Sequence, residues 1–148
     1  GNPLYPGQVS SPTVRTFPGP LNPVAHAPTA EYPVAATTFR LTEHYLSGPM
    51  SRFNSWLNEL QPEMFAEIGP ELAAERGVGN GDWVTVKSAR GAIRCRALVT
   101  HRIKPLTVAG RTVYQVGLPF HWAFAGEVVG GNANDLTAIV ADPNVSMH

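Results

Sequence analysis

The side chains that most often carry chemistry do not form a catalytic set in this sequence. Its five histidines show no pair at the spacing of metal ligands, and neither H-E-x-x-H nor G-x-S-x-G occurs. The single cysteine, Cys95, cannot form an internal disulfide and excludes thiolate zinc or iron–sulfur sites built within this chain. Its alternation with Ile93 and Ala97 predicts a small buried residue. A self-contained hydrolase or metalloenzyme is therefore not indicated.

Polar groups do gather where a predicted strand passes through a Gly-containing loop into a predicted helix, over residues 38–52. Such a junction presents free backbone N–H groups and the positive end of a helix dipole, which together suit a phosphate. Arg40 and Arg52 add bidentate donors suited to pyrophosphate or to a guanine edge. We therefore predict an anion-binding surface in this segment.

A second polar cluster combines residues 115–122 with residues 131–137. It offers amide, imidazole and indole donors beside flat rings, a surface able to hold a polycyclic heteroaromatic group. Simpler interpretations exist for single members: Arg40 as an ordinary ion-paired residue, His44 and His121 as satisfied histidines, Trp122 as core, Asn134 as a helix cap.

The elements that must position these clusters are mostly strands. Hydrophobic alternation and β-branched residues predict strands at 36–41, 65–68, 83–87, 92–101 and 112–116. Helical spacing predicts helices at 49–60 and 69–77, and residues 105–110 and 118–131 are predicted loops. Trp56 and Trp83 are expected to be structural, and Arg94 and Arg96 to face solvent or an interface. This order predicts a small β-barrel with short inserted helices.

Composition divides the chain into two parts. Residues 1–34 are Pro-rich and predict an extended linker or arm, whereas residues 35–148 form the predicted domain. Charged residues are only 15% of the chain and the formal net charge is zero, which argues against a nucleic-acid partner and favours surface that faces protein or ligand. No apolar run predicts membrane insertion. The start, Gly1-Asn2-Pro3, is not typical of an initiation site, so we expect a fragment or processed piece.

Four ordered motifs resemble the C-terminal dinucleotide-binding domain of molybdopterin oxidoreductases. They are Thr38-x-Arg40-Leu41-Thr42-Glu43-His44-Tyr45 with Gly48-Pro49-Met50-Ser51-Arg52; residues 73–91; Gly117-Leu118-Pro119-Phe120-His121-Trp122; and Ala133-Asn134-Asp135-Leu136-Thr137. The third and fourth are most similar to large (alpha) subunits of formate dehydrogenases, and residues 1–6 resemble the linker that enters this domain.

The resemblance implies a double-psi β-barrel of the aspartate-decarboxylase-like kind, packed on the rest of a large catalytic subunit. It implies bis(molybdopterin guanine dinucleotide) with molybdenum or tungsten, shared with the other domains, and oxidation of formate to carbon dioxide. In that family the metal-bound selenocysteine or cysteine and the iron–sulfur ligands lie upstream, so this chain alone should be inactive. An iron–sulfur electron-transfer subunit is an expected partner, and a periplasmic location at the outer face of the cytoplasmic membrane is favoured over the cytoplasm.

Carried over residue by residue, the resemblance assigns a binding surface and no catalytic or metal-ligating residue. The pterin and phosphate side would be lined by Arg40, Thr42, Glu43, His44 and Tyr45. Ser51 and Arg52 would hold a phosphate or nucleotide portion, and the second face would be closed by Gln115, His121, Trp122 and Asn134. Two alternatives remain: another molybdopterin oxidoreductase, of the nitrate reductase or formylmethanofuran dehydrogenase type, and a non-catalytic β-barrel interaction module whose Pro-rich arm wraps a partner.

Overall fold

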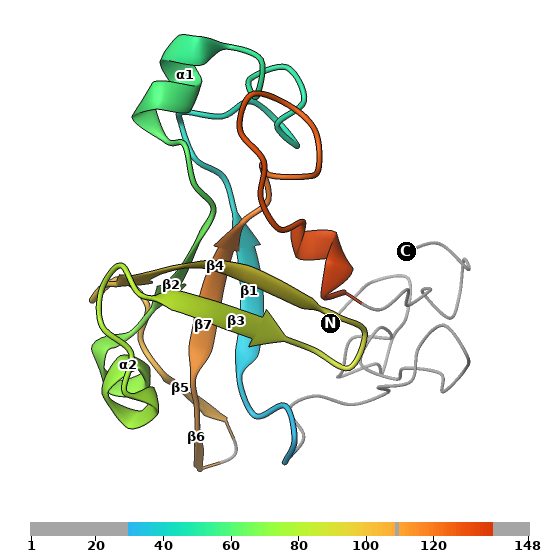
Figure 1. Ribbon diagram of the computed structural model, residues 1–148. Coiled ribbons are helices and arrows are strands. Elements are labelled where there is room, and N and C mark those ends of the chain that lie inside the picture. Colours follow the sequence, from blue (N-terminus) through green and yellow to red (C-terminus); the bar gives the residue numbers. More distant parts are fainter. Residues whose placement is uncertain (1–29, 109, 138–148) are drawn as a thin grey trace, which may run out of the picture.

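The computed structural model describes residues 30–108 and 110–137. One five-stranded sheet, in the order β1-β7-β2-β4-β3, dominates these residues, and β5 and β6 form a separate hairpin (Figure 1). The strands are β1 (Ala35–Phe39), β2 (Phe65–Ile68), β3 (Trp83–Lys87), β4 (Ala92–Val99), β5 (Leu106–Val108), β6 (Arg111–Val113) and β7 (Gln115–Pro119). The helices in the described residues are α1 (Ser55–Leu60), α2 (Pro70–Arg76) and the short 3₁₀ helix η2 (Ala133–Asp135). The predicted mostly β fold with short helices is confirmed.

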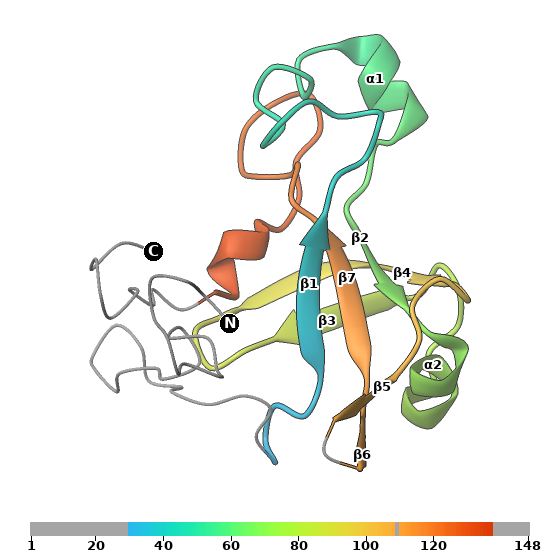
Figure 2. The same cartoon turned by 180° about the vertical axis from the view of Figure 1, so that it is seen from behind.

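The sheet is mixed and strongly curled. Strands β1 and β7 pair in parallel, as do β2 and β4, whereas β2–β7 and β3–β4 are antiparallel. Figures 1 and 2 both show the β3–β4 hairpin running across the direction of β1 and β7. Among the described strands, β1 and β3 are therefore the two edges of a sheet that bends toward closure. The double-psi connectivity itself stays a prediction.

The core lies where the central strands cross. All four residues of β2 are buried, and Cys95 on β4 is 1% exposed, as the alternation predicted. Burial also raises the pKa of the Cys95 thiol to about 11, so the thiol is a packing group and not a nucleophile. Helix α2 follows with Pro70 in its first turn and ends at Gly77 in the left-handed conformation, both as predicted.

The helix predicted at residues 49–60 is confirmed only in its second half. Residues 49–53 form turns, and α1 begins only at Ser55, because Asn54 has extended backbone and its side chain caps the Leu57 N–H. The predicted apolar stripe therefore does not reach the core. Trp56 is 83% exposed, and Trp83, also expected to be structural, is 48% exposed.

The loop predicted at residues 105–110 and the strand at 112–116 are also wrong in their limits. A β5–β6 hairpin turns through Gly110, which has a positive φ of 74°, and β7 then runs to Pro119. The alternation of Thr112 to Val116 had merged two strands that separate at Tyr114. Most of the predicted Pro-rich arm, residues 1–29, lies outside the described residues, so the boundary at residue 34 stays a prediction.

Candidate cofactor-binding site

Two segments far apart in the sequence meet at the carboxyl ends of β1 and β7. Because these strands are parallel neighbours, the segments that follow them leave the sheet at the same edge. We call residues 40–61, which include α1, and residues 120–131 the crown. Figures 1 and 2 show the two segments side by side above the sheet. The crown thus unites the first predicted cluster with His121 and Trp122 of the second.

His121 holds the first segment of the crown by both ring nitrogens. Its Nε2 accepts from the Leu41 N–H at 2.8 Å, and its Nδ1–H donates to the Leu46 carbonyl oxygen. This pattern requires the neutral ring, which is 0% exposed. Burial is the largest influence on the pKa of His121 and lowers it. The hydrogen bond to Leu46 acts in the opposite direction. Of the nearby charges, His44 and Arg40 lower the pKa and Glu43 raises it. Residues 41–46 are therefore fixed as an arch over a neutral imidazole.

Arg52 ties the two segments together. Its Nε donates to the Ala125 carbonyl at 2.6 Å, and its Nη1 donates to the carbonyls of Ser47 at 3.0 Å and His121 at 2.7 Å. The side chain is buried, with the residue only 5% exposed. A guanidinium is suited to this task because its donors diverge in one plane. Arg52 therefore acts here as an internal clamp on three backbone carbonyls.

His44 and Ser51 make a second internal link, within the first segment. His44 Nε2–H donates to the Gln61 carbonyl at 2.9 Å, its Nδ1 lies 3.0 Å from Ser51 Oγ, and Ser51 Oγ also accepts from the Tyr45 N–H. The Trp122 ring packs against the His44 ring with centroids 4.8 Å apart. Trp122 Nε1 is buried and has no hydrogen-bond partner in the part of the chain that the structure describes.

The outer face of the crown presents a different set of side chains. Arg40, Thr42 and Tyr45 are exposed, and Glu43 is partly buried. The Arg40 guanidinium lies 5.8 Å from the centroid of the Phe120 ring, and none of the ion pairs within residues 30–108 and 110–137 involves it. Arg40 is thus oriented by a ring face and keeps its donors for an anion.

The eleven predicted site residues therefore fall into three groups. His44, Ser51, Arg52, His121 and Trp122 form the buried interior of the crown, and Arg40, Thr42, Glu43 and Tyr45 lie on its surface. Two others are elsewhere. Gln115 begins β7, at the opposite end from His121, and its side chain donates to the Lys104 carbonyl. Asn134 is an exposed member of η2, where Asn132 and not Asn134 supplies the cap.

Some members of the crown escaped sequence reasoning. Asn58 is buried and donates to the Arg52 carbonyl and to Glu127 Oε2, at 2.9 and 3.0 Å, which joins α1 to the second segment. No local pattern in the sequence marks this pair.

Gly48 could have been recognised from the sequence, because a glycine before a proline marks a turn. In the structure a Cβ at this position would lie 1.9 Å from the His121 carbonyl oxygen.

The described residues bring together no group of three or more His, Cys, Asp or Glu side chains able to hold a metal ion. Within the same ranges no helix has the length and apolar character needed to cross a bilayer. What the crown offers is a hydrogen-bonded interior beneath a surface that exposes Arg40, Thr42 and Tyr45, an arrangement that can hold a ligand.

Protonation of His121 is expected to destabilise the protein. The unfolded chain titrates near the ordinary pKa of 6.5, whereas burial lowers the folded value. Below pH 6.5 the unfolded chain binds more protons at this ring than the folded chain does. The free energy of unfolding therefore decreases as the pH falls, until the folded ring also protonates. Above pH 6.5 the contribution of the neutral His121 ring to stability is fully present. Urea midpoints recorded at steps from pH 7.5 to pH 5.5 measure this dependence.

Two glutamine variants separate His121 from the other titrating groups. His121→Gln removes the titrating ring and should flatten the pH dependence, whereas His101→Gln changes an exposed histidine and should preserve it. An identical slope in the wild type and in His121→Gln would contradict the assignment.

The fold is shared with a solved enzyme structure. A chain of the acetylene hydratase from Pelobacter acetylenicus superimposes with a TM-score of 0.54 at 18% identity, over 72% of this chain and 15% of that one. This similarity concerns the fold alone. At the level of sequence, residues 34–147 match the model of the molydopterin dinucleotide binding domain, and the chain belongs to that family.

Curated relatives are larger proteins. The chain is 45% identical over 150 residues to the nitrate-inducible formate dehydrogenase major subunit of Escherichia coli, and 40% identical over 140 residues to the formate dehydrogenase 2 alpha subunit of Nitratidesulfovibrio vulgaris. It covers 97% and 95% of its own length in these matches but only 14% of each relative. The assimilatory nitrate reductase catalytic subunit of Bacillus subtilis is 35% identical over 120 residues, 81% of this chain and 15% of that protein.

Proposed function

We propose that this chain is the part of a formate dehydrogenase large subunit that helps to hold bis(molybdopterin guanine dinucleotide) through the outer face of the crown. The observation that carries the proposal is the unpaired, ring-oriented guanidinium of Arg40 on a segment fixed from below by His121 and Arg52. The bound cofactor, with molybdenum or tungsten, would supply the two-electron oxidation of formate to carbon dioxide. The residues of this chain bind and orient it.

The surface side chains have the chemistry that such a dinucleotide requires. Arg40 offers charge and paired N–H donors to a pyrophosphate, and the exposed hydroxyl groups of Thr42 and Tyr45 offer further donors. Glu43 is an acceptor for the N–H edge of a guanine or pterin ring. The buried five residues do not face outward, so their contribution is to keep the surface groups in place.

The crown also has the surface of an interface. Among the residues that the structure describes, eight of the eleven exposed large hydrophobic residues belong to it: Tyr45, Leu46, Met50, Phe53, Trp56, Leu60, Phe124 and Val129. Such a concentration of apolar groups beside a ligand surface is typical of a contact with another protein segment. We propose that the remainder of the large subunit covers this face and closes the cofactor site. An iron–sulfur subunit and a location at the outer face of the cytoplasmic membrane belong to the same proposal, supported by resemblance alone.

Arg40→Ala in the full-length subunit tests the assignment. Loss of a charge-assisted phosphate contact is expected to lower cofactor retention about tenfold, since such a bond contributes about 1.5–3 kcal/mol. Metal content and released guanine nucleotide of the purified subunit measure retention, and formate-dependent dye reduction should fall in proportion.

Arg94→Ala provides the matched control, because Arg94 is an exposed arginine on β4 that packs against Trp83 instead of the crown. It should leave retention and turnover unchanged. Full cofactor content together with normal formate oxidation in Arg40→Ala would overturn the assignment. Nitrate reduction without formate oxidation by the wild-type complex would favour the nitrate reductase alternative, to which the relative from Bacillus subtilis belongs.

A further inference from the structure

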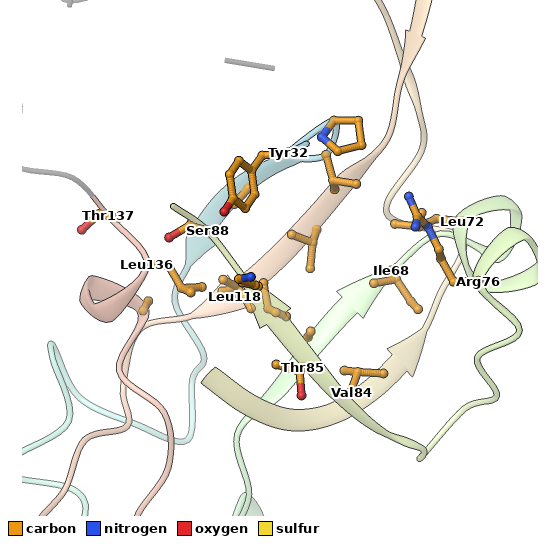
Figure 3. Close-up of a pocket in the computed structure, with 18 of the residues that line it drawn as sticks. Tyr32, Ile68, Leu72, Arg76, Val84, Thr85, Ser88, Leu118, Leu136 and Thr137 are labelled. Atoms are coloured by element: carbon orange, nitrogen blue, oxygen red, sulfur yellow. The ribbon is translucent and has the colours of Figure 1, made fainter. Parts of the chain in front are cut away.

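The β3–β4 hairpin has two unlike faces. Its inner face packs Val84 and Val86 against the core, beside a cavity of about 820 Å³ that Ile68 also lines (Figure 3). Its outer face is polar, and the side chains there are exposed apart from the half-buried Arg96. We call this the hairpin face; its cross-strand pairs are Trp83 with Arg96, Thr85 with Arg94, and Lys87 with Ala92. Three of these six side chains are cationic and none is acidic.

Trp83 orients two of the three cations. The guanidinium carbon of Arg94 lies 4.6 Å from the centroid of the Trp83 ring, and that of Arg96 lies 4.1 Å from it. Both distances are those of a cation–π contact, which favours a charged group over an aromatic face. The Trp83 residue remains 48% exposed between them. The ring therefore holds two arginine head groups in place at a surface that a second molecule can reach.

The positive charge of the hairpin face is only partly balanced. Arg96 Nε donates to Glu63 Oε2 at 3.0 Å, which shows how a carboxylate approaches this face. In the part of the chain that the structure describes, no ion pair involves Arg94 or Lys87. Two exposed cations therefore remain for carboxylates that the described residues do not supply.

We infer that the hairpin face binds an acidic, extended segment of a separate protein, with two carboxylates placed two residues apart. Arg94 and Lys87 are diagonal neighbours across the antiparallel pair, and such positions lie about 7–8 Å apart. Alternate side chains of an extended segment repeat at about 7 Å, so one carboxylate reaches each cation. Trp83 supplies the ring face beside them, and tryptophan and arginine are the residues that most often anchor a protein interface.

The character of the face favours a separate protein over the other occupants. Permanent interfaces are apolar, as the exposed surface of the crown is, whereas charged faces are typical of contacts that form and dissociate. Two free cations on a chain of zero net charge are too few to bind the phosphates of a nucleic acid. No residue of the hairpin face belongs to the crown, so this inference and the proposed cofactor role can fail independently.

An NMR titration of the 148-residue chain tests the inference. The probe is a synthetic hexapeptide of alternating Thr and Glu, and the matched peptide carries Gln in place of Glu. The Glu peptide should shift the resonances of the Trp83 indole N–H and the Arg94 Nε–H until they saturate. Its Kd should increase at least about threefold between roughly 20 and 200 mM salt, because salt screens exposed charges. The Gln peptide should give no saturable shift.

Variants of the two free cations test the assignment of residues. Arg94→Gln and Lys87→Gln should each weaken binding of the Glu peptide about threefold, as expected for the loss of one exposed ion pair. The double variant should abolish the saturable shift. Arg111→Gln is the matched control, since it removes the same charge from an exposed position on β6 and should leave the Kd unchanged.

Three results would overturn the inference. The first is equal binding of the Glu peptide by the wild type and the double variant, with the amide spectrum showing that both are folded. The second is equal binding of the Gln peptide. The third is tighter binding of a single-stranded oligonucleotide or of phosphatidylglycerol vesicles at the same resonances, which would assign the face to phosphate groups instead of carboxylates.

Discussion

Gly48→Ala is expected to lower the free energy of unfolding by about 3 kcal/mol or more, because it combines backbone strain with a clash against fixed backbone. Gly48 has a φ of +97°, and a Cβ there would lie 1.9 Å from the His121 carbonyl oxygen and 2.5 Å from Arg52 Nη1. The carbonyl already accepts from Arg52, so it cannot move without breaking the clamp. Urea unfolding at pH 7.5 measures the loss.

Gly77→Ala separates the two causes. Gly77 also has a positive φ, of +63°, but a Cβ there would meet nothing within 4 Å. Its replacement should therefore cost only the left-handed strain, about 1–2 kcal/mol. Equal losses in the two variants would mean that the close approach of Gly48 to His121 contributes nothing. In the full-length subunit, Gly48→Ala should also reduce cofactor content, whereas Gly77→Ala should not.

Arg52→Ala is expected to have the second largest effect. It leaves the carbonyls of Ser47, His121 and Ala125 without the donor that now satisfies them. Each unsatisfied buried acceptor costs about 1–3 kcal/mol, and water entering the vacated space offsets part of the sum. We expect a loss of about 3 kcal/mol, measured by chemical denaturation, and a crown that no longer holds its two segments together.

Arg52→Lys tests the geometry of the clamp. A lysine keeps the charge but cannot reach three carbonyls in one plane, so it should recover less than half of the lost stability. Arg94→Ala serves again as the control: its guanidinium lies 4.6 Å from the Trp83 ring centroid on an exposed face, and its removal should cost below about 1 kcal/mol. A small loss in Arg52→Ala, comparable to that control, would contradict the role of Arg52.

Local patterns were sufficient for much of the sheet. Strands β2 and β3 and helix α2 follow from short-range alternation, from Pro70 and from Gly77, and they were predicted within a residue. The helix predicted at 49–60 extends only over residues 55–60, and its apolar spacing was wrongly interpreted as a face buried in the core. In the structure these apolar residues lie on an exposed surface. Spacing alone does not distinguish a helix face packed on the core from one that contacts a segment outside the chain.

The candidate site was predicted as a set of residues but not as an arrangement. Polar residues such as Arg40 and Arg52 look alike in sequence, yet one is exposed and the other is 5% exposed. The difference arises from the parallel pairing of β1 with β7, which connects positions about 80 residues apart. The separation of Gln115 from His121 follows from the limits of β7, which begins at Gln115 and ends at Pro119, two residues before His121. The strand predicted at residues 112–116 ended too early to show this separation.

The eight exposed hydrophobic residues of the crown also affect how such a protein is produced in a cell. A domain released with Trp56 at 83% and Phe124 at 94% exposure presents the surface that chaperones and proteases select, and that drives self-association at high concentration. On the function proposed above, folding of this region would be coupled in time to its docking on the rest of the large subunit. Loading of the dinucleotide at the same face would then precede or accompany burial of the crown.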